Sequence, residues 1–68
     1  MDSQPQQIIR LPDVLRLTSL GRTRLDELVQ QGRFPPPIRL SVRRKGWVAS
    51  EVAGWIANRI KDRDGRQT

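Results

Sequence analysis

Three consecutive prolines, Pro35 to Pro37, constrain the fold more than any other feature of this 68-residue chain. Proline has no backbone N–H to donate, and its ring disfavours helical geometry in the preceding residue. No helix can therefore run through this segment. Just upstream, Gly32 stands where a helix would end in a left-handed cap, a conformation that glycine adopts readily. The chain is thus predicted to be helical before Gly32 and to change character after the prolines.

The segment 18–32 is predicted to contain a helix over about residues 22–31 that buries one face. Leu25, Leu28 and Val29 recur at i, i+3, i+4 spacing, which is typical of a helix with one buried stripe. The opposite face and its flanks carry hydrogen-bonding side chains, namely Arg22, Thr23, Arg24, Asp26, Glu27, Gln30 and Gln31. Such a helix suits insertion into the major groove of DNA. An ordinary amphipathic surface helix has the same pattern, so both interpretations remain open on this segment alone.

A shorter helix is predicted upstream. Pro12 fits the first helical position and Asp13 the first turn, while Val14 and Leu15 provide an apolar face. Thr18 and Ser19 end this helix after about two turns. Two short helices joined by a turn of about four residues form a helix-turn-helix candidate.

After the prolines, the pattern favours a β-hairpin. Ile38 and Leu40 alternate with polar residues as in a strand with one buried face, and Trp47-Val48 is predicted to be the returning strand. The intervening turn would carry three consecutive cations at the hairpin tip, Arg43, Arg44 and Lys45. A solvated turn has the same composition. A hairpin of this size needs support from the helices.

A third helix is predicted to follow, with Ser50 as its N-cap and an apolar face that ends at Ile60. Both tryptophans are assigned to the core rather than to base stacking. The predicted core is Val14, Leu15, Leu20, Leu25, Leu28, Val29, Phe34, Ile38, Leu40, Trp47, Val52, Trp55 and Ile56. The predicted organisation is a disordered tail at 1–7, one domain at 8–60 and a flexible charged tail at 61–68.

Composition narrows the function. Thirteen Lys and Arg against seven Asp and Glu give a net charge of +6, which favours nucleic acid or another anionic surface. The chain has no cysteine and no histidine, so it has no disulfide, no thiolate metal site and no imidazole base. No nucleophile–base pair is evident, so we expect no enzyme, cofactor or metal. No apolar run could span a bilayer or serve as a signal peptide, which predicts a soluble cytoplasmic protein with no membrane partner.

Several local motifs together resemble a known family. The segments Leu11-Pro12-Asp13-Val14, Gly32-Arg33-Phe34-Pro35, Gly46-Trp47 and Ser50-Glu51-Val52, followed by Trp55-Ile56, are similar to those of AlpA-type prophage regulatory proteins. The resemblance covers residues 8–60. It implies a winged helix-turn-helix, a small mainly α-helical fold with a β-hairpin wing, related to phage excisionases and to the DNA-binding head of MerR-type regulators. It places the recognition helix at about residues 22–31 and the wing at about residues 38–48.

The sequence departs from the family pattern in the recognition helix. Gly21 stands where the family usually has Ser, Asp26 where Tyr is usual, and Glu27 where a basic or polar residue is common. Acids facing phosphates disfavour binding, but a carboxylate can accept a hydrogen bond from the amino group of cytosine. We expect Glu27 to read a base and Asp26 to lie nearer the DNA backbone. The predicted DNA-contacting residues are Arg22, Thr23, Arg24, Asp26, Glu27 and Gln30 in the helix, and Arg39, Arg43, Arg44 and Lys45 in the wing.

Three functions fit these observations. The first is a sequence-specific regulator of mobile-element genes such as an integrase gene, with double-stranded DNA and RNA polymerase as partners. The second is an excisionase that bends DNA and directs a phage-type integrase. The third is a protein-interaction or RNA-binding module that has lost duplex binding. Only eight residues follow Ile60, too few for a long coiled coil, so we expect a monomer in solution that is cooperative only on tandem DNA sites.

Overall fold

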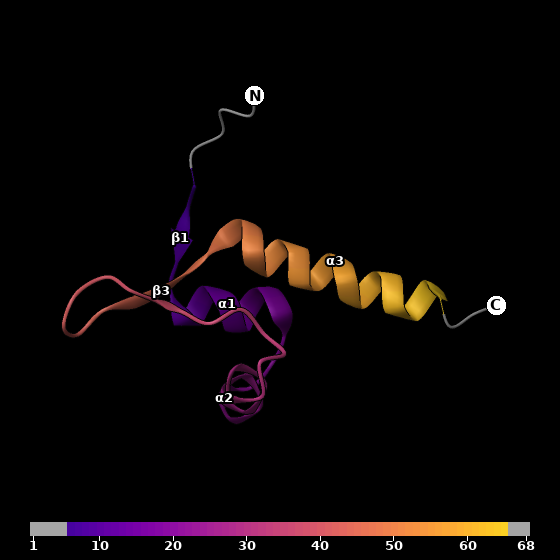
Figure 1. The fold of residues 1–68 in the computed structure, drawn as a ribbon, viewed down its shortest axis with the longest axis horizontal. Helices are drawn as coiled ribbons and strands as arrows, with labels where there is room; N and C mark the ends of the chain where they lie inside the picture. Colours follow the sequence, from indigo (N-terminus) through magenta and orange to yellow (C-terminus); the bar gives the residue numbers. More distant parts are fainter. Residues whose placement is uncertain (1–5, 66–68) are drawn as a thin grey trace.

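The computed structural model describes residues 6–65. The elements are β1 (Ile8–Ile9), α1 (Leu11–Thr18), α2 (Arg22–Gln30), β2 (Ile38–Arg39), β3 (Lys45–Val48) and α3 (Ala49–Gly65). The three strands form an antiparallel sheet in the order β1-β3-β2. The loop between β2 and β3 projects at one end of the molecule and α3 at the other (Figure 1). The predicted disorder of residues 1–5 lies outside the described residues.

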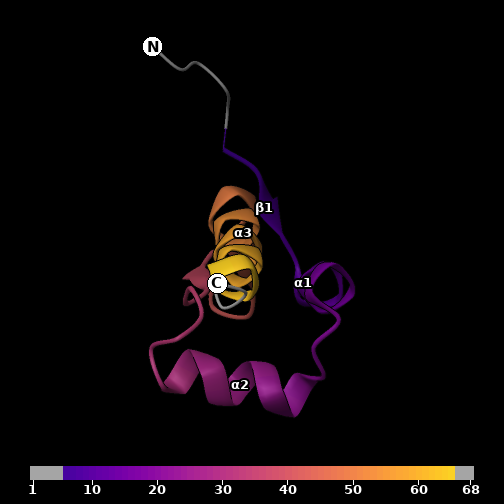
Figure 2. The ribbon, with the colours of Figure 1, turned by 90° about the vertical axis from the view of Figure 1, so that its right-hand side faces the viewer.

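Helices α1 and α2 form the predicted helix-turn-helix. Pro12 lies in the first turn of α1, and the helix ends at Ser19, which adopts a left-handed conformation with φ 61°. The Thr18 hydroxyl donates to the Val14 carbonyl at 2.8 Å and accepts from the Leu20 N–H at 3.3 Å, which fixes the turn. The turn spans residues 19–21, one residue fewer than predicted. Beyond it, α2 crosses the direction of α1 and α3 (Figure 2).

The end of α2 has the predicted glycine cap. Gly32 has φ +73°, and its N–H donates to the Val29 carbonyl at 3.1 Å. The Arg33 N–H donates to the Leu28 carbonyl at 2.8 Å, which completes a Schellman motif. This cap turns the chain sharply before the prolines, so that Phe34 returns to the core.

The core lies where the helices meet one face of the sheet. Its buried side chains are Val14, Leu25, Leu28, Phe34, Trp47 and Val52, and Ile9, Leu11, Leu15, Leu20, Val29, Trp55 and Ile56 pack around them. Trp47 donates from Nε1 to the Pro35 carbonyl at 3.0 Å, and Trp55 donates to the Arg33 carbonyl at 2.8 Å. Each indole thus buries apolar surface and satisfies its N–H, as a structural tryptophan should. The prediction that both tryptophans belong to the core is confirmed.

Two predicted core residues are wrong. Ile38 is 41% exposed and Leu40 is 46% exposed. Side chains alternate between the two faces of a strand, so position 46 belongs to the face opposite the one on which Trp47 is buried. Ile38 is paired with Gly46, so its side chain lies on that opposite face. The alternation was predicted correctly, but the face was reversed. Ile8, Ile38 and Leu40 therefore lie on the outer face of the sheet.

The predicted N-cap of α3 is also wrong. The helix begins at Ala49, directly after β3, so Ser50 lies inside the first turn. The Ala49 N–H donates to the Gln7 carbonyl at 2.8 Å, while the Ser50 hydroxyl donates to Gln6 Oε1 at 3.2 Å. The residue just before β1 thus accepts from the first N–H of α3, in place of a serine cap. Gln6 and Gln7, which belong to the segment predicted to be disordered, thus both contact the start of α3.

Helix α3 also continues beyond its apolar face. It ends at Gly65, five residues after the predicted end at Ile60, and Arg59 pairs with Asp62 at 3.3 Å along it. Residues 57–65 are exposed throughout. Within the described part of the chain, no helix combines the length and apolar character needed to cross a membrane.

Gly46 provides a stability prediction. A Cβ there would collide with Ile8 Cγ2 and would lie 3.2 Å from both the Ile9 carbonyl oxygen and Leu40 Cδ1. Gly46→Ala is expected to lower the free energy of unfolding by about 1–3 kcal/mol, because a β-branched side chain and a backbone oxygen must both move. Gly54→Ala is the matched control. A Cβ at Gly54 meets nothing within 4 Å, so this change should stabilise the helix by up to about 1 kcal/mol. Thermal unfolding by circular dichroism measures both, and equal midpoints would contradict the packing described.

Candidate nucleic-acid interface

The outer face of α2 is polar and accessible. Leu25 and Leu28 are buried on the core side, while Thr23, Glu27 and Gln30 are exposed on the opposite side. Gly21 is the N-cap of α2, with an extended backbone, and no side chain caps this helix start with a hydrogen bond. This exposed surface has the arrangement that a recognition helix needs, with hydrogen-bonding groups at successive turns.

Arg24 lies on the flank of α2 that faces away from the sheet. Its guanidinium donates to Glu27 Oε1 at 3.1 Å, and each side chain is 51% exposed. A half-exposed pair of this kind is weak in water. Both groups therefore remain available to a binding partner, and any contact that Glu27 makes will also affect Arg24.

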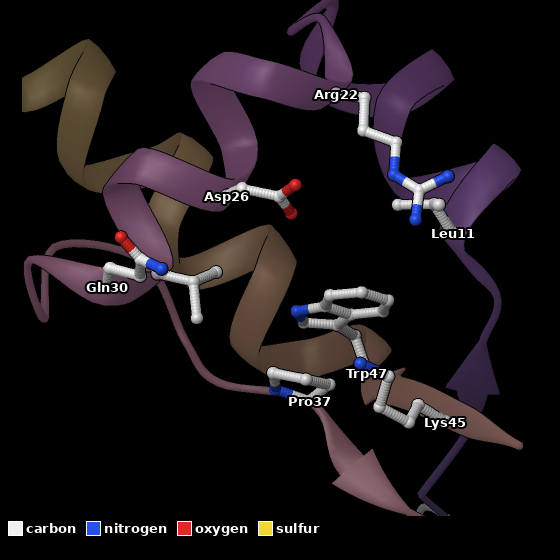
Figure 3. A pocket seen from close by; sticks show the side chains of 8 residues that line it. Leu11, Arg22, Asp26, Gln30, Pro37, Lys45 and Trp47 are labelled. Atoms are coloured by element: carbon white, nitrogen blue, oxygen red, sulfur yellow. The ribbon is translucent and has the colours of Figure 1, made fainter. Parts of the chain in front are cut away.

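The opposite flank of α2 forms a groove with the sheet. Figure 3 shows the Asp26 carboxylate and the Arg22 guanidinium turned toward this groove, with Trp47 across from them. The groove has a volume of about 240 Å³ and is lined by Leu11, Arg22, Asp26, Val29, Gln30, Pro37, Lys45 and Trp47. Asp26 forms no ion pair with any side chain of residues 6–65. It lowers the positive potential that Arg22 and Lys45 create around the groove.

The tip of the hairpin is a tight turn. The N–H groups of Leu40 and Ser41 donate to the Arg44 carbonyl at 2.8 and 3.1 Å, and the Arg44 N–H donates to the Ser41 carbonyl at 3.4 Å. Val42 and Arg43 therefore occupy the corner of the turn. Arg43 and Arg44 are exposed, and neither forms an ion pair within residues 6–65.

Lys45 is not at the tip, which corrects the predicted run of three tip cations. It lies in β3, directly opposite Arg39 of β2. Like charges opposed across two strands destabilise a hairpin unless an anion lies near them. Lys45 and Arg39 share the face of the sheet that carries Trp47, so the reversed face brings both cations to the side of α2. The sequence did not predict that Asp26 and Lys45 would line the same groove, because their placement depends on how the wing packs on α2.

The structure thus gathers the predicted residues in three places. Thr23, Arg24 and Glu27 lie on α2 outside the groove. Arg22, Asp26, Gln30 and Lys45 line the groove, and Arg39, Arg43 and Arg44 lie on the hairpin. Six of these side chains are cations and two are acids. Leu11 and Pro37 were not predicted as part of this surface, and neither has a sequence signal for such a role.

A helix-turn-helix formed by α1 and α2, followed by a β-hairpin and a third helix, defines a winged helix-turn-helix protein. This chain belongs to the AlpA family, since the family model for the prophage CP4-57 regulatory protein (AlpA) matches residues 7–60. The chain is also 37% identical over 62 residues to ORF88, an uncharacterised protein of Enterobacteria phage P4, covering 91% of this chain and 70% of that protein. No solved structure matches the chain. The predicted family and fold class are confirmed.

Proposed function

We propose that this chain is a sequence-specific double-stranded DNA-binding protein that regulates transcription of mobile-element genes, such as an integrase gene. The observation that carries the proposal is the juxtaposition of an exposed polar helix face with a cationic hairpin. Helix α2 would read base edges in the major groove, while Arg43 and Arg44 would bind the backbone or the adjacent minor groove. Membership of a prophage regulatory family supports this function.

The proposed function needs no cofactor or catalytic group. It places the protein in the bacterial cytoplasm, at the nucleoid, with RNA polymerase as the machinery whose access to a promoter it changes. The excisionase alternative would use the same surface and would have an integrase as its partner.

The function is tested by binding to DNA from the neighbourhood of the chain's own gene. Tiled duplex fragments are titrated with the full chain at a fixed salt concentration, beside a shuffled duplex and an RNA of the same sequence. At least one fragment should bind about 10³-fold more tightly than the shuffled duplex, a ratio typical of specific recognition. Equal binding to all duplexes, or tighter binding to RNA, would overturn the proposal. A promoter fused to the bound fragment then distinguishes a transcription regulator from an excisionase without transcriptional effect.

The free protein is expected to be a monomer. The exposed end of α3, residues 61–65, is polar and charged, so it offers no apolar seam for a coiled coil. Sedimentation at micromolar and higher concentrations should give the mass of a single chain, 7.8 kDa. A tight dimer would be inconsistent with this surface, and its loss on Leu40→Ser would place the contact on the outer face of the sheet.

A further inference from the structure

The corner of the hairpin carries an apolar side chain that the fold does not use. Val42 is 87% exposed, more than the other large hydrophobic residues on the surface of the described chain. A single exposed aliphatic residue is ordinary at a protein surface. The position of Val42 is unusual, however. The corners of turns favour Pro, Gly, Asn, Asp and Ser, each for a backbone reason that valine does not share. Neither core packing nor turn chemistry therefore accounts for Val42.

The neighbours of Val42 indicate what it would contact. It shares the corner of the turn with Arg43, and Arg44 follows, so the tip is an apolar group flanked by cations. The minor groove of A·T-rich DNA is narrow and strongly negative, which attracts arginine. Its walls and floor also accept apolar side chains, which pack against sugars and base edges and can unstack a base step. One turn corner is small enough to enter a groove about 6 Å wide.

We propose that Val42 is a specificity-determining residue that probes the minor groove. Its methyl groups pack against an A·T or T·A pair, while Arg43 and Arg44 bind the flanking groove and phosphates. At a G·C pair the guanine 2-amino group projects into the minor groove and prevents this packing. The wing thus selects A·T pairs beside the sequence that α2 reads. This inference rests on the proposed function.

The test uses base analogues that alter one groove at a time. Inosine in place of guanine removes the 2-amino group and leaves the major groove unchanged, and uracil in place of thymine removes only the major-groove methyl group. In the best-bound duplex, pairs flanking the α2 site are changed singly to G·C, inosine·C or A·U. The wild-type chain should bind inosine·C and A·T duplexes about fivefold more tightly than G·C, the gain from burying part of one valine.

Val42→Ser is the diagnostic variant, and it should fold normally because the side chain is exposed. It should lose the fivefold preference and leave the dependence of binding on salt unchanged, since no cation is removed. Arg43→Ala is the matched control, with a shallower salt dependence. A preference retained by Val42→Ser, or a change in binding when uracil replaces thymine at these pairs, would overturn the assignment. Failure of the wild-type chain to bind any duplex would instead overturn the proposed function, so the two failures are distinguishable.

Discussion

Replacing Arg43 and Arg44 together with alanine is expected to weaken binding to all duplexes and to reduce the salt dependence of binding. Both side chains lie at the hairpin tip and form no ion pair within the described chain, so they are available to phosphates. Each phosphate that is no longer neutralised should lower the slope of log K against log salt by about 0.9 units. The slope of the double variant should therefore fall by up to about two units, measured by titration between low and physiological salt.

The control for the wing variant is Lys61→Ala with Arg63→Ala. This pair removes the same two charges from the end of α3, at the opposite end of the molecule from the hairpin (Figure 1). Its slope should stay close to that of the wild-type chain. Equal reductions of the slope in the two double variants would mean that net charge, and not the wing, controls binding. Lys45→Ala, in the groove, should lower the slope by up to about one unit.

The two adjacent acids of α2 are expected to have opposite effects. Glu27 lies on the outer face with Thr23 and Gln30, where its carboxylate can accept from the amino group of cytosine. Glu27→Ala should relax discrimination at one base pair by roughly 1–3 kcal/mol. Because Glu27 pairs with Arg24 at 3.1 Å, this change also frees a cation for phosphate, so specificity should fall more than affinity.

Asp26→Ala removes the same charge one residue away and is the matched control. Asp26 faces the groove beside Arg22, so its removal leaves the cations of the groove unopposed. Binding should become tighter for every sequence and its salt dependence steeper, with base preference unchanged. Competition titrations with matched and mismatched duplexes separate the two effects. If Asp26→Ala changed base preference and Glu27→Ala did not, the orientation proposed for α2 on DNA would be wrong.

Local chemistry in the sequence predicted the helical part of this fold. The stripe of Leu25 and Leu28 and the Gly32 cap are short-range features, and the structure confirms both. Ser50 has the chemistry of an N-cap, yet the Gln7 carbonyl, 42 positions away from Ala49, satisfies the first N–H of α3. A cap supplied by a distant strand has no local signal, so a local rule fails there.

In the hairpin, too, a local pattern in the sequence was not enough to predict the structure. Alternation in Ile38 to Ser41 predicts a strand but does not say which face is covered, and one residue of register reverses the choice. Gly46 decides it here, because a side chain at this position would collide with Ile8 and crowd Leu40 on the outer face. The reversed face moves Arg39 and Lys45 to the side of α2. The sequence therefore suggests which polar and charged residues form the candidate site, but it predicts neither the apolar Leu11 and Pro37 nor the division of the site into helix face, groove and hairpin tip.

The central claim, that α2 reads bases while the wing binds the adjoining DNA, is tested most directly by selection from a randomised duplex pool. The full chain is used at physiological salt, beside the Thr23→Ala/Gln30→Ala variant, whose two changes are at exposed positions of α2. The wild-type chain should enrich one sequence, and the α2 variant should lose that preference while keeping its non-specific affinity. A pool that stays random with the wild-type chain, or the same enriched sequence with both proteins, would contradict the assignment of α2 as the recognition helix.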